Sequence, residues 1–147
     1  MSIRKTAGWS SLSALILSAT LLFTLSTPAT AASSAISGTI TPCGHNQYYA
    51  TGRVNALNQN SAFFKATRLG PCGTNTLTVG LRGTKGAAAS HAKVTVTNTS
   101  STFKFKATNG ASYISGGTFY VTGHQAGACG PCTGSFAGNL TYSVPAG

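Results

Sequence analysis

The chain has 147 residues with ten Lys+Arg, three His and no Asp or Glu, so its formal net charge is +10 at pH 7. Without side-chain carboxylates, the composition excludes retaining and inverting glycosidases, Ser-His-Asp hydrolases and carboxylate-based calcium or magnesium sites. Such uncompensated positive charge attracts polyanions at low ionic strength.

The first 31 residues have the three parts of a secretory signal peptide. Arg4 and Lys5 form a basic region, residues 12–25 form an apolar region, and Ala29-Thr30-Ala31 supplies a small-residue cleavage pattern. The apolar region is too short for a membrane span, which needs about 20 apolar residues. We therefore expect a signal peptide of bacterial type over residues 1–31, which is cleaved, and a secreted, extracellular single domain over residues 32–147.

The mature chain shows no helical periodicity. Short runs rich in Thr, Val, Phe and Tyr alternate with clusters of Gly, Asn, Ser and Pro, the pattern of strands and turns. We expect eight strands, near residues 35–40, 47–54, 62–69, 76–82, 92–98, 102–108, 117–123 and 138–144. About eight short strands without a helical crossover predict an all-β fold, a small antiparallel β-sandwich or barrel stapled by disulfides.

Alternation along these strands assigns the core. The expected core positions are Leu77, Val79, Leu81, Phe119, Val121, Leu140, Tyr142 and Val144. In the segment FFKATR, adjacent Phe63 and Phe64 must point to opposite faces of one strand.

The clearest hairpin is AKVTVTNTSSTFKFKAT, residues 92–108. With a two-residue loop, Val96 lies opposite Phe103 and Val94 opposite Phe105, all on the inward face. The same register places Thr95 opposite Lys104, and Lys93 opposite Lys106. Three lysines then share the solvent face, where opposed like charges are mildly destabilising. They indicate an anionic partner, although lysines on outer strands also discourage edge-to-edge aggregation.

The cationic side chains of the mature domain are the candidate binding residues. We expect Lys93, Lys104 and Lys106 to carry binding, with further contributions from Arg53, Lys65, Arg68, Arg82 and Lys85. The expected partner is an anionic polymer of a cell envelope, or nucleic acid, bound by a monomer, and an antimicrobial action on a competitor's envelope is an extension of that function.

The four cysteines predict two disulfides in a secreted domain. They are Cys43, Cys72, Cys129 and Cys132, and three pairings are possible. We favour bridges 43–72 and 129–132. The tetrapeptide Cys129-Gly130-Pro131-Cys132 is also the dithiol signature of thioredoxin-like oxidoreductases, but that dithiol begins a helix, whereas the following residues read as a glycine-rich strand.

Other chemistries remain as alternatives. His45, His91 and His124 with a lysine contain the parts of a small basic ribonuclease, and a Cys/His set is an alternative zinc site. A secreted protease inhibitor is a further alternative, with the loop 84–92 (TKGAAASHA), which contains Lys85, as its exposed binding loop. We expect no cofactor, no metal and no catalysis, and therefore a secreted cationic binding protein.

Overall fold

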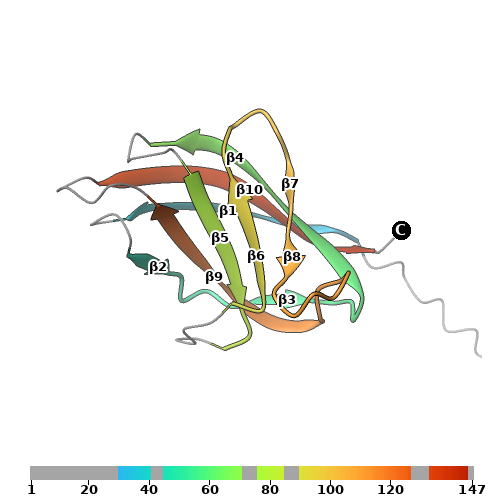
Figure 1. The fold of residues 1–147 in the computed structure, drawn as a ribbon. Coiled ribbons are helices and arrows are strands. Elements are labelled where there is room, and N and C mark those ends of the chain that lie inside the picture. Colours follow the sequence, from blue (N-terminus) through green and yellow to red (C-terminus); the bar gives the residue numbers. More distant parts are fainter. Residues whose placement is uncertain (1–29, 41–44, 71–75, 85–89, 127–132, 146–147) are drawn as a thin grey trace, which may run out of the picture.

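The computed structural model describes residues 30–40, 45–70, 76–84, 90–126 and 133–145, which form two antiparallel sheets (Figure 1). The strands within these ranges are β1 (Ala32–Ile40), β2 (Asn46–Tyr48), β3 (Arg53–Asn55), β4 (Asn60–Leu69), β5 (Thr76–Arg82), β6 (Ala92–Val96), β7 (Phe103–Lys104), β8 (Lys106–Ala107), β9 (Gly117–Ala126) and β10 (Gly134–Pro145). No residue in them is helical. The predicted all-β, antiparallel class is confirmed. Residues 1–29 of the predicted signal peptide and all four cysteines lie outside the described residues.

Each sheet joins strands that are distant in the sequence. The four-stranded sheet has the order β1-β10-β4-β7, and the six-stranded sheet has the order β2-β9-β5-β6-β8, with β3 also pairing with β9. In Figure 1, β5 and β6 cross in front of β1 and β10. The two sheets therefore form the layers of a β-sandwich.

One hydrophobic core lies between the sheets. Leu77, Val79 and Leu81 of β5 are at most 1% exposed, as their alternation predicts. From the other sheet, the Phe136 ring reaches across to Gly123 of β9, where its Cζ would lie 2.8 Å from an added Cβ. The glycine therefore makes the space that lets the ring join the two layers.

The predicted hairpin over residues 92–108 is correct at one end only. Lys93 lies opposite Lys106 in the β6–β8 pair, as the register required. At the other end, β7 pairs with β4, which places Phe103 against Phe64 rather than against Val96. The predictions that Val96 faces Phe103 and that Thr95 faces Lys104 are therefore wrong. The chain after the turn crosses from one sheet to the other, forming the arch between β6 and β7 in Figure 1.

The strand predicted over residues 47–54 is two short strands. β2 and β3 both pair with β9, and the regular pairing ends between them after Tyr49, whose N–H still donates to the Val121 carbonyl of β9 at 3.0 Å. The Tyr49 hydroxyl donates to the Ser37 carbonyl at 3.0 Å, and its ring meets Phe136 edge-on with centroids 6.4 Å apart. The Tyr49 ring therefore packs against β1 and β10, while its backbone keeps one hydrogen bond to β9.

Val144 is not a core residue, which corrects the predicted alternation at the end of β10. The β10–β4 register shifts between Thr141 and Val144. Ser143 has a left-handed φ of 57° and is only 2% exposed, so it takes the buried position that alternation assigned to Val144, whereas Tyr142 packs against the core as predicted. A β-bulge of this kind reverses which side chains face the core.

Tyr49 makes the stability of the fold sensitive to high pH. Burial raises the pKa of its hydroxyl to about 12, against the opposing effect of the nearby Arg53 charge. An unfolded tyrosine ionises near pH 10. Between about pH 10 and 12 the unfolded chain therefore loses this proton before the folded protein does, and stability falls through that window while being unaffected below it.

We expect Tyr49→Phe to cost about 1 kcal/mol of unfolding free energy near pH 8, because the hydrogen bond to Ser37 is lost. The difference from wild type should shrink as the pH rises above about 10. Chemical denaturation of both proteins at several pH values measures it. A difference that stays constant up to about pH 12 would contradict the coupling.

Candidate polyanion-binding surface

Lys93 and Lys106 lie opposite each other on the outer face of the six-stranded sheet. In β6, Ala92 and Val94 are buried, so strand alternation directs the intervening Lys93 to solvent. Both lysines are exposed. Directly opposed like charges weaken a strand pair, so a partner that neutralises them would remove a cost that is built into the sheet.

Lys104 joins this pair where the chain opens between β6 and β7. Because β7 pairs with β4, a gap remains beside β6. The gap is a groove of about 490 Å³, which we call the lysine groove. It is lined by Lys93, Val94, Thr95, Thr102, Phe103, Lys104 and Lys106. The three lysines of the predicted hairpin therefore line one hollow, although the register that was expected to bring them together holds only in part.

The charge in the lysine groove is uncompensated. No Asp or Glu occurs anywhere in the chain. None of the three lysine side chains has a hydrogen-bond or ion-pair partner among the described residues. Three ammonium groups around an open hollow raise the local concentration of anions.

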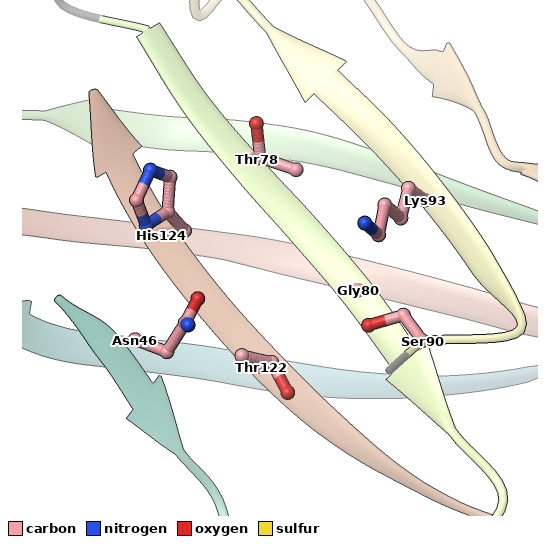
Figure 2. Close-up of a pocket in the computed structure, with 7 residues that line it drawn as sticks. All are labelled: Asn46, Thr78, Gly80, Ser90, Lys93, Thr122 and His124. Carbon is pink, nitrogen blue, oxygen red and sulfur yellow. The ribbon is translucent and has the colours of Figure 1, made fainter. Parts of the chain in front are cut away.

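A second hollow lies beside the lysine groove, on the same outer sheet face (Figure 2). Its volume is about 340 Å³, and we call it the sheet pocket. It is lined by Asn46, Thr78, Gly80, Ser90, Lys93, Thr122 and His124. Lys93 belongs to both hollows, and Figure 2 shows its amino group extending from β6 toward β5.

The sheet pocket arises from two neighbouring rows of paired residues. In one row, His124 of β9 lies between Asn46 of β2 and Thr78 of β5. In the next row, Gly80 lies between Thr122 and Lys93. Gly80 carries no side chain at the centre of the ring, and a Cβ there would collide with the Ser90 hydroxyl.

Sequence reasoning singled out Lys93 and His124 of this pocket, but not Asn46, Thr78 or Thr122. Alternation within β5 and β9 does mark Thr78 and Thr122 as outward-facing, because the residues on either side of each threonine are apolar or small. It does not show that β9 lies between β2 and β5. That neighbour relationship spans more than forty residues of chain and is visible only in the fold.

The other predicted cations are dispersed. Lys65 and Arg68 are exposed on β4 of the four-stranded sheet. The Arg53 guanidinium bonds the Ser34 hydroxyl and the Thr51 carbonyl, both at 3.0 Å. Lys85 lies outside the described residues.

Arg82 was expected to contribute to the binding surface, but it is only 1% exposed. Its guanidinium lies under the Tyr48 ring, 4.4 Å from the ring centroid. Such a cation–π contact holds the arginine within the protein. We therefore leave Arg82 out of the proposed binding surface.

The described histidines lie at separate places. His124 lines the sheet pocket, whereas His91 lines another hollow with Gly83 and Phe119. His45 is exposed directly before β2. Partial burial lowers the pKa of His91. A ribonuclease that uses two histidines needs both at one phosphate, and neither of these two hollows contains a pair.

Several predicted features fall outside the described residues. They are the four cysteines, with their redox and zinc alternatives, and residues 85–89 of the predicted inhibitor loop. Among the residues that the structure does describe, no three His, Cys, Asp or Glu side chains are grouped to hold a metal ion. No helix within the same residues is long and apolar enough to span a membrane.

Comparison with known proteins gives little further guidance. No family model matches the sequence, and no curated protein matches it. A solved structure of a Bacillus endospore appendage, from a novel family of disulfide-linked pili, aligns with 15% sequence identity and a TM-score of 0.34. The alignment covers 92% of this chain and 100% of that chain. We draw no functional assignment from so low a similarity.

Proposed function

We propose that this protein is a secreted, non-enzymatic binder of anionic polymers, with cell-envelope polymers as its natural partners, and that the lysine groove is its principal contact surface. The observation that carries the proposal is the convergence of Lys93, Lys104 and Lys106 on one hollow in a chain without acidic side chains. A polymer with repeated negative charges neutralises all three lysines at once and releases its own counterions.

Protection of sheet edges explains these lysines only in part. β7 and β8 are terminal strands of their sheets, so Lys104 and Lys106 have positions where charge prevents edge-to-edge pairing. Lys93 is different, because β6 pairs with β5 on one side and with β8 on the other. Edge protection does not require a charge there, and a bound anion does give Lys93 a role.

We expect the wild-type protein to be retained on immobilised heparin at about 50 mM salt, where screening is weak, and to elute as salt rises. Lys93→Gln combined with Lys106→Gln should weaken binding. It should also make the negative slope of log affinity against log salt shallower by about 1.5, because two charge contacts are lost. The same double variant should be at least as stable as wild type, since an opposed like-charge pair is removed.

The matched control is Lys65→Gln combined with Arg68→Gln. It also removes two positive charges, but from the four-stranded sheet and outside the lysine groove. It should keep most of the affinity and the salt slope of the wild-type protein. Equal losses in both double variants would show that binding follows net charge alone. Passage of the wild-type protein through the column without retention would refute the proposed function.

A further inference from the structure

The sheet pocket is polar on every side that the structure describes. Its side chains provide two threonine hydroxyls, one serine hydroxyl, one amide, one imidazole and one ammonium group. Figure 2 shows them around Gly80, which leaves the centre of the ring open. A volume of about 340 Å³ is within the range of small-ligand pockets.

Two polar atoms in the wall of this pocket are buried without a hydrogen-bond partner. They are the hydroxyl oxygen of Thr122 and Nδ1 of His124. Thr122 is only 6% exposed, so its hydroxyl has also lost most of its contact with water. Buried polar groups are nearly always paired in native proteins, and an unpaired one costs stability. Turning either side chain about its χ1 bond brings its unpaired atom toward the pocket, where a ligand hydroxyl pairs it.

The composition of the wall favours sugar or polyol hydroxyls over nucleic-acid bases. Hydroxyl, amide and imidazole groups both donate and accept hydrogen bonds, which matches the dual character of a ligand hydroxyl. Bases are held mainly by stacking on aromatic rings, and His124 is the only ring among the lining residues. The nearby Tyr48 ring already lies over Arg82.

We propose that the sheet pocket binds one sugar or polyol unit of a hydroxyl-bearing polyanion, while neighbouring anionic groups of the same polymer lie along the lysine groove. Lys93 links the two hollows because it lines both. This inference rests on the proposed function and names its ligand class: acidic glycans or polyol phosphates, rather than polyanions in general. The lysine groove supplies affinity, and the sheet pocket supplies selectivity.

The test compares two polyanions of matched charge and length, a heparin fragment that carries ring hydroxyls and inorganic polyphosphate that carries none. We expect the wild-type protein to bind the heparin fragment about tenfold more tightly, because hydrogen bonds to the hydroxyls add to a similar charge contribution. Fluorescence anisotropy with labelled polymers at a fixed salt concentration measures the ratio.

Thr122→Val is the decisive variant, because it replaces the unpaired hydroxyl by a methyl group of similar size. Combined with Thr78→Val, it should remove most of the tenfold preference while leaving polyphosphate affinity and salt slope unchanged. Thr122→Val alone should melt at a temperature at least as high as wild type, since it removes a buried unpaired polar group. The control is Thr67→Val, an exposed threonine of β4, which should keep the preference.

The outcomes separate the two proposals. Equal affinity of the wild-type protein for both polymers refutes the sheet-pocket proposal and leaves the proposed function standing. Binding to neither polymer refutes the proposed function. If the folded Thr78→Val, Thr122→Val double variant keeps the preference for the heparin fragment over polyphosphate, selectivity lies in another part of the surface. That result overturns this inference.

Discussion

Replacing Asn60 by alanine is expected to lower the free energy of unfolding by about 4 kcal/mol. Asn60 is fully buried at the start of β4. Its side-chain amide donates to the carbonyls of Leu57 at 2.8 Å and Ile114 at 2.7 Å, and its oxygen accepts from the Asn55 side chain at 2.8 Å. Alanine leaves these three groups without that hydrogen-bond partner.

The loss should extend through a connected network. The Asn55 side-chain oxygen accepts from the Ser143 hydroxyl at 3.0 Å, and the backbone N–H of Ala56 donates to the same hydroxyl at 3.1 Å. Asn60 and Asn55 therefore tie β3 and β4 to the bulge in β10, where Ser143 has its left-handed backbone. Buried networks of this kind lose more than one isolated hydrogen bond when a member is removed.

Urea unfolding of Asn60→Ala and wild type measures the effect. Asn139→Ala is the matched control, because Asn139 is exposed on β10 and its side chain has no hydrogen-bond partner among the described residues. That control should change stability by less than about 0.5 kcal/mol. A loss below about 1 kcal/mol in Asn60→Ala would show that the network is not a significant source of stability.

Gly138→Ala is the second substitution with a large expected effect, a loss of about 3 kcal/mol. The Phe64 ring of β4 lies directly over Gly138 of β10. An added Cβ would lie 2.7 Å from Cε1 of that ring and 2.6 Å from the backbone carbonyl oxygen of Lys65. The ring is fully buried and the carbonyl belongs to the strand ladder. Neither can move without disturbing the core or the pairing of β4 with β10.

Gly83→Ala is the control for this substitution. Its nearest neighbour to an added Cβ is Nδ1 of His91 at 4.0 Å, so the space is open. We expect it to be neutral or to stabilise by about 0.5 kcal/mol, because alanine restricts the unfolded chain. Thermal and urea unfolding of both alanine variants give the comparison, and similar losses in the two would contradict the packing explanation.

Local alternation was enough to predict most strands and several faces. β5 begins and ends where predicted, at Thr76 and Arg82, and its three apolar residues are buried. Phe63 and Phe64 do differ in burial, as opposite faces require, with only Phe64 fully buried. Alternation failed at Ser143, because a bulge adds a residue to one strand and changes which side chains face inward.

The lysine groove could be predicted in part. The outward faces of Lys93, Lys104 and Lys106 follow from their spacing, and the turn between them is short enough to bring Lys93 opposite Lys106. The groove itself exists because β7 leaves β6 for β4. The alternation of apolar and polar residues from 92 to 108 does not indicate that β7 pairs with β4 instead of with β6.

The sequence by itself determined the properties that depend on composition and on neighbouring residues: the absence of carboxylate chemistry, the positive charge, the β class and the face of most side chains. Only the tertiary structure decided which strands are neighbours. It placed β9 between β2 and β5, which brings the residues of the sheet pocket together. It also buried Arg82 beneath the Tyr48 ring. The physical reason is that side-chain period is a local property, whereas pairing between distant strands is selected by the packing of the whole core.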